Sequence, residues 1–235
     1  MEETVFEMQY RRRQPHRRRR PRRRKAWGVI LALTALVVLA AALLWLNRDR
    51  SLPGEGVTLP DYVQKDLLPV NPWSRPGTPL EKIDGVVIHY VGNPDTTAQA
   101  NRNYFASLAS GEEGTYASSH FIVGLEGEVI QCVPLTEIAY ASNERNEDTI
   151  AIEVCHPDET GEFSDVTYWR TVELTAWLCN TFHLDPEKDV IRHYDVTGKR
   201  CPLYYVEHPE AWEDFLVDVA AEAEAQAQAA EEDVP

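Results

Sequence analysis

Hydrophobic and polar positions recur with different periods along the chain, and each period predicts one kind of element. Residues 26–46 form a run of 21 residues without a charge, which at about 1.5 Å per residue is long enough to cross a membrane core of roughly 30 Å. Residues 84–91 are a β-branched run between glycines and predict a buried strand, as do residues 149–154. Residues 120–123 and 129–133 flank a Glu-Gly turn and predict a hairpin.

Stretches with helical spacing alternate with these strands. One begins at an Asp or Thr cap in residues 95–108, and another begins at Ser164 and carries an apolar stripe that includes Trp169. A short strand at 189–193 and a helix at 209–219 complete the pattern. Strands that alternate with helices predict an α/β fold, with a single mixed central β-sheet flanked by α-helices.

Composition and charge divide the chain into five parts. The predicted parts are a basic tail at 1–25, a transmembrane helix at 26–46, an extracytoplasmic linker at 47–66, a globular domain at 67–219 and an acidic low-complexity tail at 220–235. We expect the last of these to be a fraying helical extension. Eleven Lys and Arg residues precede the apolar run, so the positive-inside rule places the N-terminus in the cytoplasm and the domain outside the cell. If the N-terminal segment is instead a cleaved signal peptide, the domain is secreted.

Charge also limits the partners of the globular domain. The net charge of the chain is −15, and the part beyond residue 25 carries −23. A surface of this sign is unsuited to phosphate binding, so we expect no nucleic-acid partner. The sequence gives no indication of the oligomeric state.

Three of four side chains capable of chemistry, those of His89, Glu153 and His193, lie at or near the ends of the predicted strands. His89, His193 and Cys201 offer the nitrogen and sulfur ligands that zinc prefers, and three protein ligands leave a fourth position for water. A lone strand histidine is more often a hydrogen-bonded core residue, so the hypothesis depends on the whole set. Glu153 follows an apolar run where an unpaired carboxylate is costly, which indicates a cleft and a general base. Lys199 is either an oxyanion-stabilising cation or a solvated surface charge.

Four sequence blocks, in order, resemble those of the zinc-dependent N-acetylmuramoyl-L-alanine amidases. This family is shared by phage lysins, bacterial cell-wall amidases and peptidoglycan recognition proteins. The blocks are VVIHYVG, SSHFIVGLEGEVIQCVP, DTIAIEVCHP and RHYDVTGKRCP, and the resemblance covers about residues 67–217. It implies a peptidoglycan hydrolase that cleaves the amide bond between N-acetylmuramic acid and L-alanine of the stem peptide.

The resemblance also implies a role for each matching residue. It implies that His89, His193 and Cys201 hold zinc. It further implies that Glu153 is the general base and that Lys199 stabilises the oxyanion. These roles agree with those expected from the residue types alone.

The chain departs from the family pattern in two places. Ser119 stands where one branch of the family has a catalytic tyrosine, and residues 139–143 replace a Trp-His-Ala-Gly segment. His120 and Asn143 are therefore only candidates for substrate contact, and His120 is equally well interpreted as a packed hairpin residue. Two other functions stay open: a catalytically inactive peptidoglycan-binding module, and an anchored protein-interaction domain with structural histidines.

The cysteines allow two interpretations. If Cys201 is a metal ligand, then Cys132, Cys155 and Cys179 form an odd set, of which at least one is unpaired. Cys155 and Cys179 could pair outside the cell, but apolar neighbours at all three positions favour buried thiols.

Overall fold

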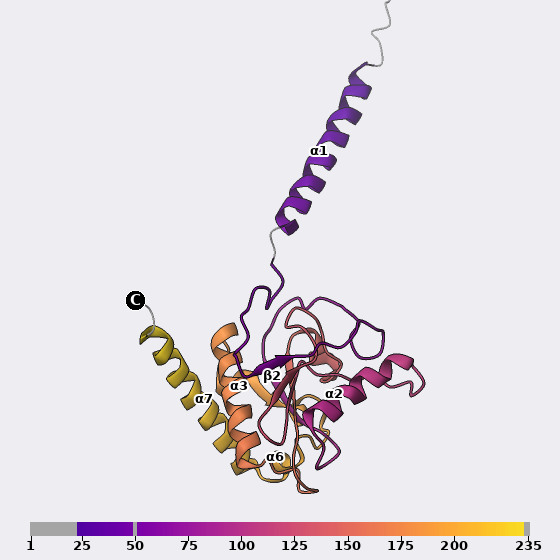
Figure 1. Cartoon of the computed structure of the whole chain (residues 1–235). Helices are drawn as coiled ribbons and strands as arrows, with labels where there is room; N and C mark the ends of the chain where they lie inside the picture. Colours follow the sequence, from indigo (N-terminus) through magenta and orange to yellow (C-terminus); the bar gives the residue numbers. More distant parts are fainter. Residues whose placement is uncertain (1–22, 49–50, 233–235) are drawn as a thin grey trace, which may run out of the picture. The chain divides into compact units, whose positions relative to one another are not determined.

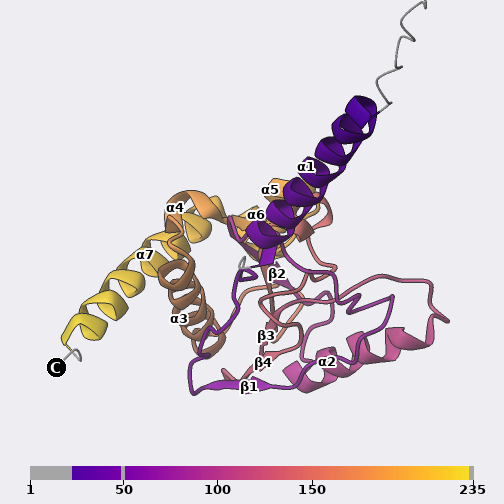
Figure 2. The same cartoon turned by 90° about the horizontal axis from the view of Figure 1, so that it is seen from above.

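The computed structural model describes residues 23–48 and 51–232 (Figures 1 and 2). Its contacts separate two units, Met1–Arg50 and Ser51–Pro235. The first unit contains helix α1 (Arg23–Arg48), in which the side chains of residues 27–43 are exposed. Most of the predicted basic tail lies outside the described residues. Among the helices in the described ranges, none combines the length and the hydropathy required to cross a membrane.

The second unit is built on one six-stranded mixed sheet. The strand order is β1-β4-β3-β5-β2-β6, in which β3 and β4 are antiparallel and the other neighbours are parallel. The hairpin and the two buried strands were predicted from the sequence, and their mixed arrangement confirms the predicted fold class. The strands are β1 (Val63–Lys65), β2 (Val86–Tyr90), β3 (Phe121–Val123), β4 (Val129–Gln131), β5 (Ile150–Val154) and β6 (Val190–Arg192).

Helices cover both faces of the sheet (Figure 2). On one face, Ile88 and Ile152 pack with α3 and α7 in the larger core. On the other face, Ile122 and Cys155 pack with α2 in a second core. Because side chains alternate along a strand, β3 and β4 contribute to both cores, with Phe121 in the larger core and Ile122 in the second. The helices are α2 (Ala98–Ser107), α3 (Asp165–Phe182), α4 (Pro186–Asp189), α5 (His193–Thr197), α6 (Leu203–Glu207) and α7 (Pro209–Glu232), with 3₁₀ turns η1 (Leu108–Ser110) and η2 (Asn143–Glu147).

The ends of several elements differ from the predictions. The predicted linker at 47–66 is too long, because Ser51 onward belongs to the folded unit and β1 pairs with β4. Helix α2 is capped by Thr97, whose side chain accepts a hydrogen bond from the Ala100 backbone, rather than by residue 95 or 96. Each of these boundaries depends on pairing or capping geometry that the hydrophobic pattern does not contain.

Two predictions about the helical side of the domain also need correction. Trp169 was predicted to face the core but is 56% exposed, because it lies at the border of the buried stripe of α3, whereas Val172 is fully buried. The low-complexity tail continues α7 as far as Glu232, as expected for a helical extension, but its first residues are packed rather than frayed. Ala223 is buried there, and its carbonyl accepts a hydrogen bond from the Asn180 side chain on α3. The tail therefore contributes to the core up to this position.

Candidate active site

The sheet register brings two of the candidate residues together. His89 on β2 lies directly opposite Glu153 on β5, and neighbours in register on parallel strands point to the same face. His193 follows β6, which pairs with β2 on its other side, and begins α5. Cys201 lies in the loop between α5 and α6. These residues converge because the carboxyl ends of parallel strands meet at one edge of the sheet.

His89, His193 and Cys201 form a compact cluster of potential metal ligands. One ligand atom from each residue lies within 4.8 Å of the others. The distance between Cys201 Sγ and His89 Nδ1 is 3.8 Å, and a tetrahedral zinc ion holds such a pair roughly 3.5 Å apart. All three side chains are buried, and neither ring nitrogen of His193 has a hydrogen-bond partner. Buried nitrogens without partners are costly, so these donors fit a bound zinc ion.

Burial keeps the cluster uncharged in the absence of a metal. It lowers the pKa of His89 well below its usual value, and the charges of His193 and Lys199 lower it further. Burial also lowers the pKa of His193. Both imidazoles are therefore neutral at pH 7, with a lone pair available. Burial raises the pKa of the Cys201 thiol to about 12, so binding of a metal must displace the thiol proton.

Glu153 is a partly buried side chain whose carboxyl group has no hydrogen-bond partner. Its Oε2 atom is inaccessible to solvent and makes no hydrogen bond. Burial raises the pKa of Glu153 to about 8, although the positive charge of Lys199 acts in the opposite direction. A carboxyl group with a pKa near the working pH is suited to accept and return a proton.

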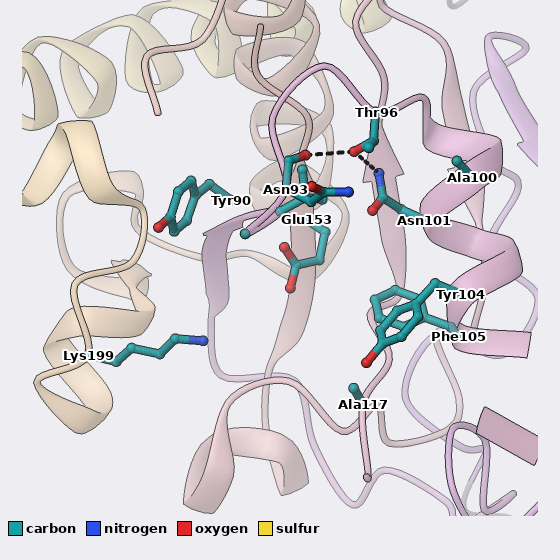
Figure 3. A pocket seen from close by; sticks show the side chains of 12 residues that line it. Tyr90, Asn93, Thr96, Ala100, Asn101, Tyr104, Phe105, Ala117, Glu153 and Lys199 are labelled. Carbon is teal, nitrogen blue, oxygen red and sulfur yellow. Dashed lines mark hydrogen bonds between the residues drawn. The ribbon is translucent and has the colours of Figure 1, made fainter. Parts of the chain in front are cut away.

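A cavity of about 430 Å³ connects Glu153 with the surface. In Figure 3, the Lys199 side chain extends from the loop after α5 towards the side of the cavity where Glu153 lies. Helix α2 forms another wall of the cavity. The lining residues on this side are Ala100, Asn101, Tyr104 and Phe105, with Asn93 and Thr96 from the preceding loop.

The two candidates for substrate contact lie in different surroundings. His120 is buried and does not line the cavity. Its Nδ1 atom accepts a hydrogen bond from the Ala151 backbone, and its Nε2 atom is 2.9 Å from the Glu137 carbonyl. These are the contacts of a packed hairpin histidine. Asn143 is exposed at the start of η2, next to Ser142, whose hydroxyl contacts His89. No motif or hydrophobic pattern in the sequence indicates a role for Ser142.

The structure resolves the question of the cysteines. All four are free and buried. Cys155 belongs to the core beneath α2, whereas Cys179 belongs to the core beneath α3, so they lie on opposite faces of the sheet. The preferred interpretation as buried thiols is confirmed.

Taken together, the fold and the site define an α/β domain with a potential metal site and a desolvated carboxyl group at one cavity. Residues 79–203 match the family described as N-acetylmuramoyl-L-alanine amidase (Amidase_2), which is more than half of the chain. The chain therefore belongs to this amidase family.

Two curated relatives come from bacilli. N-acetylmuramoyl-L-alanine amidase BlyA of Bacillus subtilis (strain 168) is 34% identical over 174 residues, which cover 66% of this chain and 46% of BlyA. N-acetylmuramoyl-L-alanine amidase CwlL of Bacillus licheniformis is 31% identical over 156 residues, which cover 61% of this chain and 42% of CwlL. The chain thus spans less than half the length of these relatives.

Solved structures show the same fold. The structure of PlyL superposes with a TM-score of 0.57 at 21% sequence identity. The match covers 67% of this chain and 96% of the PlyL chain. The catalytic domain of XlyA superposes with a TM-score of 0.55 at 22% sequence identity. The match covers 67% of this chain and 98% of the XlyA chain. At these identities the likeness establishes the arrangement of the sheet and its helices.

Proposed function

We propose that this protein is a zinc-dependent peptidoglycan amidase that hydrolyses the amide bond between N-acetylmuramic acid and L-alanine of the stem peptide. The observation that carries the proposal is the position of three potential zinc ligands beside a partly buried, unpartnered Glu153 at an open cavity. The family match and the names of the curated relatives support the substrate.

The set of potential ligands supports one position for the metal in the domain. His89, His193 and Cys201 would hold zinc, which when bound polarises a carbonyl group and lowers the pKa of water towards roughly 7. Neutral imidazoles with free lone pairs are prepared for this role without a change of protonation.

Glu153 and Lys199 supply the proton transfer and the charge stabilisation. Because the Glu153 carboxylate is desolvated and has no partner, it has a high affinity for the proton of the attacking water. It then returns this proton to the amino group of the departing L-alanine. The Lys199 ammonium, which extends towards the Glu153 side of the cavity, stabilises the negative charge that develops on the lactyl oxygen.

Incubation with a purified muropeptide tests the proposed reaction. We expect mass spectrometry to find a free glycan and a peptide that begins with L-alanine, with activity lost in a chelator and restored by zinc. Stoichiometric zinc without cleavage of any muropeptide would instead favour an inactive peptidoglycan-binding module. A protein without zinc affinity would favour an interaction domain with structural histidines.

We further propose that the amidase domain is anchored at the outer side of the cell membrane. The support is in the sequence, where the uncharged residues 26–46 follow eleven Lys and Arg residues. Fractionation should leave the full chain in membranes after a carbonate wash, and protease added to protoplasts should remove the domain. Recovery from the medium of a chain that begins beyond residue 46 would indicate a cleaved signal peptide.

A further inference from the structure

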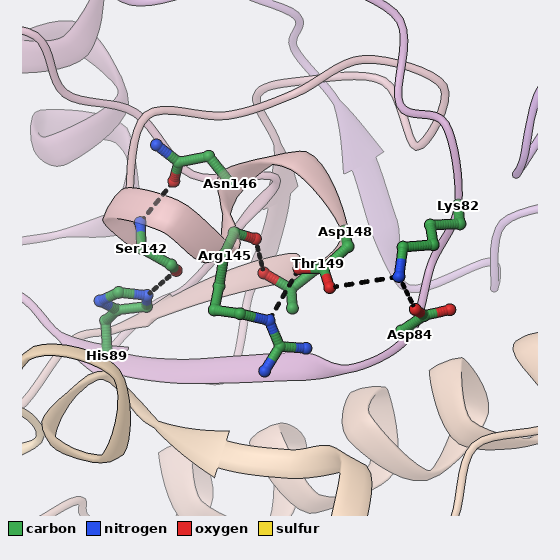
Figure 4. Close-up of polar contacts among 8 residues, drawn as sticks. All are labelled: Lys82, Asp84, His89, Ser142, Arg145, Asn146, Asp148 and Thr149. Carbon is green, nitrogen blue, oxygen red and sulfur yellow. Dashed lines mark hydrogen bonds and ion pairs between the residues drawn. The ribbon is translucent and has the colours of Figure 1, made fainter.

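The two ring nitrogens of His89 face different partners. Nε2 lies 3.0 Å from the hydroxyl oxygen of Ser142, as Figure 4 shows. Nδ1 lies 3.8 Å from Cys201 Sγ, on the side of the ligand cluster. Both His89 and Ser142 are 1% exposed, so bulk water does not compete for either nitrogen.

This arrangement makes the tautomer of His89 important. A neutral imidazole carries one proton, and only the other nitrogen has a lone pair for a metal. Because Nδ1 faces Cys201, it can act as a ligand atom only when the proton is on Nε2. The Ser142 oxygen is within hydrogen-bond distance of Nε2 and can accept that proton.

The chain holds Ser142 in place through its backbone. The backbone N–H groups of Ala141 and Ser142 both donate to Asn146 Oδ1, at 3.0 and 2.5 Å. The turn η2 that carries Asn146 contains no buried residue, so polar contacts rather than packing fix its position. One of them joins Arg145 Nε to Asp148 Oδ1 at 2.7 Å (Figure 4).

We propose that Ser142, held by Asn146, is a positioning residue that fixes His89 in the Nε2–H tautomer and so presents Nδ1 to the metal. The proposal rests on the ligand role of His89 in the proposed function. It applies to His89 alone, because the nitrogens of His193 have no hydrogen-bond partner. His89 is therefore oriented by a protein hydrogen bond before the metal binds, whereas the only partner expected for His193 is the metal itself.

Nuclear magnetic resonance of the metal-free, full-length protein tests the tautomer directly. With ¹⁵N-labelled histidine at neutral pH, long-range proton–nitrogen spectra distinguish Nδ1–H from Nε2–H. We expect Nε2–H for His89 in the wild type and a mixture of tautomers in Ser142→Ala. In Ser142→Thr, which restores a hydroxyl group, we expect the wild-type spectrum. An Nδ1–H tautomer in the wild type would overturn the proposal.

Zinc affinity, measured by competition with a chromophoric chelator, provides the second readout. Loss of the partner of a ligand histidine typically weakens metal affinity by 10–100-fold, and we expect about this loss in Ser142→Ala. Asn146→Ala keeps the hydroxyl but releases its backbone, so its loss should be smaller. If Ser142→Thr does not fold, Asn146→Ala tests whether the position of the Ser142 hydroxyl controls zinc affinity. Unchanged affinity and tautomer in both alanine variants would refute the positioning role.

Lys82→Ala is the matched control. Lys82 belongs to the same polar group through Asp84 and Asp148 but makes no contact with His89 (Figure 4). It is exposed, and exposed ion pairs contribute little, so this variant should keep the wild-type tautomer and zinc affinity. Neither readout requires catalysis. A protein that binds zinc but cleaves no muropeptide would refute the proposed function and leave this inference standing.

Discussion

Replacement of Glu153 by glutamine should stabilise the metal-free protein while it abolishes hydrolysis. Burial raises the pKa of Glu153 from 4.5 to about 8 in the folded state. Below pH 4.5 the carboxyl group is protonated in both states and has no effect. As the pH rises above 4.5, the unfolded chain loses its proton while the folded chain retains it, so the folded state loses stability until about pH 8.

The magnitude follows from the two pKa values. Each pKa difference of one corresponds to about 1.4 kcal/mol, so the loss for Glu153 is roughly 3 kcal/mol at pH 7 and below about 1 kcal/mol at pH 5. Glu153 is partly buried and lines an open cavity, so screening by solvent makes this value an upper limit. Glutamine has a similar shape and no ionisation, so Glu153→Gln should avoid the loss.

Urea denaturation of the full-length protein in EDTA, at pH 5 and pH 8, measures the effect. The free energy of unfolding of Glu153→Gln should exceed that of the wild type by up to roughly 3 kcal/mol more at pH 8 than at pH 5. Glu81→Gln, at an exposed position, should match the wild type at both pH values. An advantage of Glu153→Gln that does not change with pH would show that the carboxylate is solvated, and the argument for its proton affinity would fail.

Three further variants test other parts of the site and the core. Cys201→Ser should weaken zinc binding. Because the wild-type thiol has a pKa of about 12, zinc binding to the wild type at pH 7 should release the thiol proton, and this release should be absent in Cys201→Ser. Calorimetry in buffers of different ionisation enthalpy measures the number of protons released. Lys199→Met should lower kcat by about 100-fold with an unchanged melting temperature, since Lys199 is exposed; unchanged kcat would exclude its role. Phe215→Ala should cost about 3–5 kcal/mol of unfolding free energy, because Phe215 is fully buried between α7 and its neighbours; a loss below about 1 kcal/mol would contradict this packing.

The sequence predicted those elements whose signals are local. The β-branched runs of β2 and β5 and the cap of α3 at Ser164 lie within a few residues of the structure they specify. Strand β1 could not be predicted in this way, because it is a half-exposed segment of three residues after prolines, and it exists through its pairing with β4. The burial of Ala223 likewise depends on packing against α3, which a low-complexity composition does not reveal.

The candidate site shows the same limit. His89, Glu153 and His193 were identified because each lies at the end of a predicted strand, and the parallel register brings them together. Ser142 was missed because its contact with His89 joins residues 53 positions apart in the sequence. The hydrogen bonds of His120 could not be predicted from the sequence either, because its partners are backbone groups of β5 and of the loop after the hairpin.

Hydrolysis of a purified muropeptide in ¹⁸O-labelled water tests the central claim most directly. If water attacks the lactyl carbonyl as proposed, the wild type with zinc will place the heavy oxygen in the carboxyl group of the muramic acid product. The peptide that begins with L-alanine will remain unlabelled, and Glu153→Gln will give neither product. Label in the peptide, or label in the glycan from Glu153→Gln at the wild-type rate, would contradict the account.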